Sequence, residues 1–378
     1  MAIPSQRHRF DIPPDLAYLN CAYLSPLMDT VMAAGRRGLA SKQHPWTITR
    51  RDFHLPVEAV RKRFAQLLGA TADDVALVAS SSYGVATASL NLELARHQNV
   101  VLLAEEHASN TYEWVRRARA VEAELRVVPR PADSDWTAAV AEHIDQATAI
   151  VALPPVHWTD GTRVDLAAIG ILCRKVGAAF VVDATQTMGA IPFDLAAVRP
   201  DYLVASAYKW LLCPYTLAFL YVAPQHHNGR PLEQHEFVRA GVLEREGATD
   251  WTFDFQPGAR RYDMGERSNF IALPMVEAAL DQLLEWTPEA IAASLEKLTS
   301  SIARRAEAIG WTVPPAAHRT QHMIGIRPPE PAALDLVQKL SARGVEVSLR
   351  GGGLRISPHL YNDENDVERL FEALESGG

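Results

Sequence analysis

Two short polar clusters near the middle of the chain carry side chains able to do covalent and acid–base chemistry. Asp183 directly follows an apolar run at residues 179–182, and Lys209 closely follows a second apolar run at residues 202–205. Lys209 stands among alanine, tyrosine, tryptophan and leucine without an adjacent acid, and burial there would disfavour the ammonium and free the amine to form a Schiff base. Asp183 can hold a heteroaromatic nitrogen protonated. The pattern predicts a site for a carbonyl cofactor that carries a phosphate.

The surrounding elements are expected to bring these residues to one edge of a sheet. Short apolar runs bounded by polar or turn residues are typical of buried strands. In open α/β sheets a ligand binds outside the carboxyl ends of the strands, where Asp183, Gln186 and Lys209 fall. The hydroxyls of Ser206 and Tyr208 can donate hydrogen bonds to a phosphate there. Taken singly, Lys209 is better explained as a surface lysine and Asp183 as a helix cap. Together, at two successive strand ends, they favour the chemical interpretation.

The stretch VVDATQTMGAIPFD followed by DYLVASAYKW resembles the pyridoxal phosphate (PLP) signature of class V aminotransferases. This family includes cysteine desulfurases, selenocysteine lyases, kynureninases and isopenicillin N epimerase-like proteins. The resemblance implies the type I fold of PLP-dependent transferases, with PLP held on Lys209 and Asp183 at the pyridine nitrogen. It also implies that Gln186, Ser206 and Tyr208 bind the cofactor.

A serine run, Ser80-Ser81-Ser82, separates a predicted strand at residues 75–78 from a predicted helix at residues 85–94. A strand, a small polar turn and a helix start form a phosphate-binding geometry, because free backbone N–H groups and hydroxyls meet there. Alone, the serines are a weak signal, because serine is a common helix cap. The resemblance implies that Ser81 and Ser82 hold the PLP phosphate.

His107 follows the next predicted strand, at residues 99–104. The resemblance implies a ring that stacks on the pyridine of PLP at this place, and His107 is the matching residue. A neutral imidazole there can also transfer a proton. A shift of one or two residues would bring Asn110 or Trp114 to the ring instead, so both alternatives stay open. Trp158 is expected to shape the substrate pocket.

Two further positions are predicted to bind the substrate. The segment LRISPHLYN resembles a family motif whose arginine clamps the substrate α-carboxylate, and Arg355 is the matching residue. An ion pair within its own domain is the structural alternative. Asn20 lies in YLNCAYLSP, which resembles a family segment that enters the active site. A turn capped by Asn20 is the alternative there.

The resemblance also implies a homodimer with active sites at the interface. In the family, the loop matching residues 262–270 crosses to the partner subunit and contacts its PLP phosphate. Ser268 is the expected donor from this loop. An ordinary helix-capping loop is the alternative.

The alternation of strands and helices predicts an α/β protein with a mostly parallel sheet covered by helices on both faces. The resemblance adds that this sheet has seven strands. From residue 288 the pattern changes to a long helix followed by short strands, which predicts a smaller α/β domain. We therefore expect an N-terminal arm at residues 1–25 that joins the small domain, a large PLP-binding domain at residues 26–260, and a small C-terminal domain at residues 261–378.

The composition argues against several classes of protein. The 378 residues carry a net charge of −8, which argues against a nucleic-acid or anionic-membrane partner. Three widely spaced cysteines give no disulfide framework, and no metal site is predicted. No apolar run reaches the ~20 residues of a membrane span. Sparse cysteines suit a reducing compartment, so we expect a cytoplasmic protein.

The resemblance implies a PLP-dependent enzyme that acts on an α-amino acid through a Lys209 Schiff base, and a class V aminotransferase is our first expectation. The alternative is an epimerase or a β-lyase of the C–S, C–Se or kynureninase-like kind. Cysteine desulfurases need a persulfide-forming cysteine on a late loop, and no cysteine follows Cys213. The non-enzyme alternative is a catalytically silent PLP-binding protein. Intact Lys209, Asp183 and Arg355 argue against it.

Overall fold

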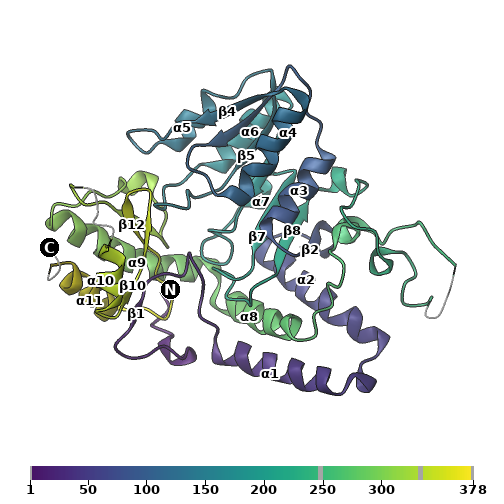
Figure 1. The fold of residues 1–378 in the computed structure, drawn as a ribbon, viewed down its shortest axis with the longest axis horizontal. Helices are drawn as coiled ribbons and strands as arrows, with labels where there is room; N and C mark the ends of the chain where they lie inside the picture. Colours follow the sequence, from purple (N-terminus) through teal and green to yellow (C-terminus); the bar gives the residue numbers. More distant parts are fainter. Residues whose placement is uncertain (1, 246–249, 331–334, 376–378) are drawn as a thin grey trace.

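A seven-stranded sheet forms the centre of the computed structural model, which describes residues 2–245, 250–330 and 335–375 (Figure 1). Its strands are β2 Val75–Val78, β3 Asn99–Leu103, β4 Glu124–Val128, β5 Thr148–Leu153, β6 Ala179–Asp183, β7 Tyr202–Ser206 and β8 Ala218–Val222. They run in the order β2-β8-β7-β6-β5-β3-β4. β8 pairs antiparallel with β2 and with β7, and the other neighbouring strands pair parallel, which confirms the predicted mostly parallel sheet.

Alternate residues of the strands belong to two separate apolar cores, because successive side chains of a strand point to opposite faces of the sheet. In β5, Val151 and Leu153 belong to one core, while Ile150 and Ala152 belong to the other. The first core includes side chains of α2 (Leu55–Leu68), α6 (Leu166–Val176) and α8 (Ala272–Trp286). The second core includes side chains of α3 (Ser81–Asn91) and α4 (Tyr112–Val121). Helices therefore cover both faces of the sheet, as the strand–helix alternation predicted.

A smaller unit combines the two ends of the chain (Figure 1). Its three-stranded antiparallel sheet has the order β11-β12-β9, and a separate parallel pair joins β1 to β10. The strands are β1 Ala17–Tyr18, β9 Ile324–Ile326, β10 Val345–Glu346, β11 Ser348–Arg350 and β12 Gly353–Ile356. The helices here are α9 Pro288–Ala308, α10 Leu336–Ser341 and α11 Glu364–Glu375.

The predicted domain boundaries stay predictions, although several contacts bear on them. β1 pairs with β10, which places part of the N-terminal arm beside the C-terminal strands. α8 packs against α1 (Asp29–Gln43) and α2, so this helix lies with the large sheet rather than with the small unit. These contacts favour a division after α8, later than residue 260.

Local boundaries differ from the sequence expectation where side chains cap the backbone. The helix expected from residue 85 begins at Ser81, because the Ser80 hydroxyl accepts a hydrogen bond from the Tyr83 N–H and caps the first turn. The sequence pattern also predicts one strand at residues 345–348, but these residues are divided between β10 and β11, which pair with different strands. The pattern further predicts a helix at residues 331–342, which lies partly outside the described residues.

The remaining helices of the large unit are short. They are α5 Trp136–Ala141 and α7 Leu195–Val198. Within the described part of the chain, no helix combines the length and the apolar character needed to cross a membrane.

Candidate active site

A cavity opens at the carboxyl ends of β3, β5, β6 and β7 and collects most of the predicted site residues. Because parallel strands end at the same sheet edge, side chains that follow different strands meet there. The lining consists of Ser81, Glu106, His107, Ser109, Pro154, Val156, Trp158, Asp183, Thr185, Gln186, Ser206, Tyr208 and Lys209.

Lys209 is buried in this cavity, with only 7% of its surface exposed. No other described residue forms a hydrogen bond or an ion pair with its Nζ; the Tyr208 ring centroid lies 5.5 Å away. Burial, followed by repulsion from Arg355, lowers the pKa of Lys209 to about 8, against the opposing attraction of Asp183. The amine is therefore partly neutral near pH 8 and available as a nucleophile.

Asp183 ends β6 and links this strand to its neighbour β7. Its Oδ1 accepts a hydrogen bond from the Thr185 N–H (3.0 Å), and the Thr185 hydroxyl accepts one from the Ser206 N–H (3.1 Å). Asp183 is only 6% exposed, and its Oδ2 has no partner among the described residues. One carboxylate oxygen is thus held by the backbone while the other remains able to bind a protonated nitrogen.

His107 and Glu106 follow β3 and face the same cavity. The Glu106 Oε1 accepts a hydrogen bond from the His107 N–H (2.5 Å), while its shielded Oε2 has no partner among the described residues. Burial, with Asp183 nearby, raises the pKa of Glu106 to about 8. Burial is the main cause that lowers the pKa of His107, and the positive charge of Lys209 lowers it further. The imidazole is therefore neutral at physiological pH.

The alternatives to His107 lie elsewhere. Asn110 and Trp114 are both fully buried and are absent from the cavity lining. Trp114 belongs to the apolar core beneath α3 and α4. The His107 ring stands edge-on to Trp158, with ring centroids 5.4 Å apart and planes at 87°. The geometry thus favours His107 over Asn110 and Trp114 as the ring that faces a cofactor.

The two serines at the start of α3 differ in their surroundings. Ser81 is 7% exposed and lines the cavity. Ser82 is exposed, and its hydroxyl is within 2.9 Å of the Ser80 hydroxyl. The first backbone N–H groups of α3 have no helical partner, so they offer donors to an anion together with the Ser81 hydroxyl.

Gln186 lines the cavity, but its side-chain amide already bonds to the protein. Its Nε2 donates to the Ala22 carbonyl (3.2 Å), and its Oε1 accepts from the Trp210 Nε1–H (2.9 Å). Tyr208 lines the same cavity, and burial raises the pKa of its hydroxyl to about 12. The Tyr208 hydroxyl therefore remains a donor across the physiological range.

Arg355 and Asn20 lie beyond the cavity lining, toward the small unit. Arg355 is 1% exposed; its Nη1 donates to the Trp158 carbonyl (2.9 Å), and its shielded Nε has no partner among the described residues. No carboxylate of the described residues pairs with this guanidinium. Asn20 Oδ1 accepts a hydrogen bond from the Ser348 hydroxyl (2.8 Å), next to the strand that carries Arg355.

Ser268 lies away from Lys209 in the same subunit. Its hydroxyl donates to the Phe53 carbonyl (2.5 Å), and it is absent from the cavity lining. The proposed contact with a partner's phosphate therefore stays a prediction.

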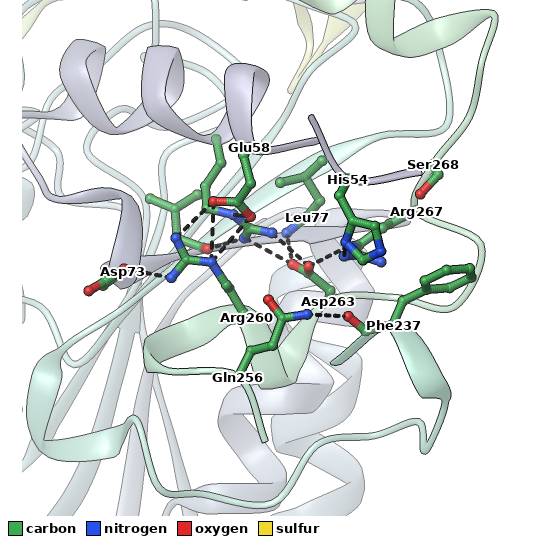
Figure 2. Close-up of polar contacts among 12 residues, drawn as sticks. His54, Glu58, Asp73, Leu77, Phe237, Gln256, Arg260, Asp263, Arg267 and Ser268 are labelled. Atoms are coloured by element: carbon green, nitrogen blue, oxygen red, sulfur yellow. Dashed lines mark hydrogen bonds and ion pairs between the residues drawn. The ribbon is translucent and has the colours of Figure 1, made fainter. Parts of the chain in front are cut away.

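The loop before Ser268 is anchored by a group of charged residues that we call the Asp263 network (Figure 2). Asp263 pairs with Arg61 (2.7 Å) and Arg267 (2.8 Å) and accepts the Leu77 N–H (2.9 Å). The other members are Glu58, which pairs with Arg61 and Arg260, and Asp73, which pairs with Arg260.

The residues of the cavity fit PLP. A buried amine without a partner can bond to an aldehyde carbon, and the open Oδ2 of Asp183 can meet a pyridine nitrogen. The start of α3 offers donors to a phosphate. Within the described residues, no group of three or more histidine, cysteine, aspartate or glutamate side chains could hold a metal ion.

Sequence reasoning did not identify Glu106, Thr185 and Ser109, which also line the cavity. Thr185 lies between Asp183 and Gln186, so its position in that segment was an available signal. Glu106 follows β3 beside His107, but the residue type alone does not reveal that its carboxyl group would be shielded and left without a partner.

A family model described as aminotransferase class-V matches residues 39–370. Isopenicillin N epimerase of Streptomyces clavuligerus is 27% identical over 392 aligned positions, which cover 98% of this chain and 97% of that protein. An uncharacterised aminotransferase, YcbU, of Bacillus subtilis (strain 168) is 26% identical over 84% of this chain and 82% of that protein.

The solved structures that resemble this chain extend over its whole length. The apo cysteine desulfurase of Thermococcus onnurineus NA1 superposes with a TM-score of 0.85 at 17% identity, covering 100% of this chain and 99% of that one. The cystine C–S lyase C-DES, in complex with cysteine persulfide, gives a TM-score of 0.83 at 18% identity, covering 96% and 97%. At these identities the likeness concerns the fold, and it confirms the predicted fold class.

Proposed function

The chain belongs to the aminotransferase class V family, and from this membership we propose an aminotransferase that binds PLP through Lys209 and acts on an α-amino acid. The observation that carries the proposal is the buried Lys209 amine, which no described residue engages and which shares a cavity with Asp183. Family membership confirms the predicted class of PLP-dependent enzyme and its cofactor.

The roles of the side chains follow from their surroundings. When bound, PLP supplies an electrophilic carbon and a ring that accepts electron density. The open oxygen of Asp183 keeps the ring nitrogen protonated, which strengthens that acceptance. Once a substrate has taken its place, the Lys209 amine is free to move a proton at the substrate Cα, and its pKa near 8 suits this transfer.

Other residues of the cavity position the two ligands. Ser81 and the first N–H groups of α3 are proposed to hold the phosphate, with the hydroxyls of Ser206 and Tyr208 as further donors. Neutral His107 is proposed to cover one face of the pyridine ring. Ser82 is proposed to contribute through its backbone N–H, since its hydroxyl points to Ser80. Gln186 is proposed to form the wall beneath the ring, because Ala22 and Trp210 already bind its amide.

The substrate α-carboxylate is proposed to bind Arg355. This guanidinium is buried without a carboxylate partner among the described residues, and burial followed by repulsion from Arg350 lowers its pKa to about 9. The attraction of an incoming carboxylate would offset both effects. Asn20 is held beside it by Ser348, and Trp158 accounts for one side of the pocket.

An epimerase is the second candidate, because the match to isopenicillin N epimerase extends over 98% of this chain and 97% of that protein. A lyase that passes sulfur to an exposed thiol is less well supported. All three cysteines are buried, and burial raises the pKa of Cys21 and of Cys173 to about 12. Burial also raises the pKa of Cys213. Thiols of this kind react slowly.

We further propose that the enzyme is a homodimer of the cytoplasm. An apolar surface supports the dimer: Trp46, Trp251 and Phe253 are 78%, 85% and 77% exposed. Arg50 donates to the Val242 carbonyl and so joins the segment after Trp46 to the loop that carries Trp251 and Phe253. Exposed patches of this kind mark association surfaces. Light scattering should give twice the chain mass, and a monomeric mass would refute the dimer.

The three free cysteines suit the cytoplasm, which fractionation of native cells would test.

The decisive experiment is to load the purified protein with PLP and reduce it with borohydride. We expect a visible absorbance band that disappears on reduction and a mass increase on the peptide that contains Lys209. A label on another lysine, or no label, would overturn the assignment. Incubation with amino acids then separates the reactions: pyridoxamine phosphate and a 2-oxo acid indicate an aminotransferase, inversion at Cα indicates an epimerase, and pyruvate or alanine indicates a lyase.

A further inference from the structure

Two arginines lie on the same face of the β11–β12 hairpin. Residues directly opposite each other in an antiparallel pair share a face, and so do alternate residues of one strand. Ser348 lies opposite Arg355, and Arg350 lies opposite Gly353. Arg350 and Arg355 therefore point to the same side, and Gly353 places no side chain between them.

Both guanidinium groups lie near the ring of Trp158. The Cζ of Arg350 is 5.7 Å and the Cζ of Arg355 is 5.9 Å from the ring centroid. Trp158 also lines the cavity that contains Lys209. Arg350 further lines a surface groove that begins beside Trp158, together with Thr159 and Gly351. The pair thus lies beside Trp158, a residue of the cofactor cavity.

Neither arginine has a carboxylate partner among the described residues. Arg355 donates to the Trp158 carbonyl and Arg350 to the Leu349 carbonyl, and each has a shielded Nε without a partner. The nearby Glu105 is already paired with Arg130 (2.9 Å).

The two positive charges also act on their neighbours. Burial is the largest cause of the lowered pKa of Arg355, and the positive charge of Arg350 is the next. The charges of both arginines also contribute to the lowered pKa of Lys209. Two uncompensated cations close together cost free energy, and anionic groups in the same place would remove that cost.

We infer that the substrate is an amino acid with a second acidic group, which binds Arg350 while its α-carboxylate binds Arg355. This inference rests on the proposed function and names the substrate class of the same site. A planar guanidinium recognises a carboxylate through two parallel hydrogen bonds, so each arginine suits one carboxylate. A substrate with a neutral side chain leaves Arg350 without a partner. The competing arrangement, in which both arginines clamp one α-carboxylate, gives no preference for an acidic side chain.

The test uses the PLP-loaded enzyme and pairs of amino acids that differ only in side-chain charge. Aspartate is compared with asparagine, and glutamate with glutamine, by titration of the cofactor absorbance and by kcat/KM. We expect the wild type to prefer one acidic member over its amide by about 10- to 100-fold, the range for a hydrogen-bonded charge. Arg350→Gln should remove that preference by weakening only the acidic member, and Arg350→Lys should retain part of it.

The matched control is Arg163→Gln, which makes the same change in net charge at an exposed arginine outside both the cavity and the groove. It should leave the preference unchanged. Equal use of acid and amide by the wild type would overturn the inference, and so would a response to neither acidic amino acid. Equal weakening of both members by Arg350→Gln would indicate the shared clamp. Absence of PLP on Lys209 would refute the proposed function as well, whereas a loaded enzyme indifferent to side-chain charge refutes only the role of Arg350.

Discussion

Buried charges have ion-pair partners in the Asp263 network but are left without such partners around Lys209. In the network, Asp263 is 2% exposed and meets two arginines and a backbone N–H (Figure 2). Burial alone would raise the pKa of Glu58, yet Arg61 and Arg260 hold it at about 2. In the cavity, the Lys209 amine and the Oε2 of Glu106 have no partner among the described residues, and neither does the Nε of Arg355 beyond it.

The difference separates a structural use of charge from a functional one. Paired ions join α2, β2 and the loop before Ser268, so their charges are already compensated within the protein. Unpaired ions cost stability, and that cost is recovered only when a ligand supplies the missing partners. Mutations in the two regions should therefore affect different measurements.

The largest effect on rate is expected for Lys209→Ala. Loss of the amine removes the covalent link to PLP and the proton transfer, which alone is worth about 10²–10⁴-fold in rate. Urea unfolding of the protein without PLP should show no loss of stability, because Lys209 makes no ion pair with the described residues and burial of its charge costs free energy. The matched control is the exposed Lys175→Ala, which should keep full turnover. A Lys209→Ala variant with normal turnover would contradict the assignment.

The largest effect on stability is expected for Asp263→Ala. This change leaves Arg61 and Arg267 buried without their anion, which costs about 3–5 kcal/mol of unfolding free energy. The exposed Asp73, which pairs with Arg260, provides the control. Asp73→Ala should cost less than about 1 kcal/mol. Equal losses for both variants in urea unfolding would show that burial does not distinguish these pairs.

Arg355→Gln is expected to affect binding by an intermediate amount. Loss of the charged contact should raise KM for amino acids by about 10- to 100-fold, the worth of a hydrogen bond to a charged group. The absorbance of bound PLP should stay as in the wild type, because Arg355 does not line the cavity. Release of PLP, or unfolding, would show that Arg355 is structural.

Glu106→Gln should change the pH dependence of stability in the protein without PLP. The pKa of Glu106 is raised to about 8, so between its unfolded value, about 4.5, and pH 8 the native state holds a proton that the unfolded state has lost. This group therefore makes wild-type stability fall with rising pH, by about 1.4 kcal/mol per pH unit in that interval. Glu106→Gln removes this contribution. Urea unfolding from pH 5 to pH 8 measures it, and parallel curves for the two proteins would contradict the raised pKa.

The sequence predicted the placement of Asp183 and Lys209 better than the electrostatics around them. The strand-end positions of Asp183 and Lys209 were predictable because each follows a short apolar run that is typical of a buried strand. The state of Glu106 was not predictable, because the shielding of its carboxyl group and the lack of a partner depend on segments that follow other strands and pack around it. Arg350 precedes Gly351 and Gly352, a sequence pattern that predicts a turn, and only the register of β11 against β12 places it on the same face as Arg355.

The pairing of β1 with β10 has a consequence for synthesis on the ribosome. Asn20 bonds to Ser348, 328 residues later, and also bridges to Ser357. The seven-stranded sheet, by contrast, is complete once residue 222 has emerged. The contacts of Asn20 therefore stay unformed in a nascent chain, and a translation product that ends between residues 222 and 355 keeps Lys209 but lacks Arg355, the residue proposed to bind the substrate carboxylate.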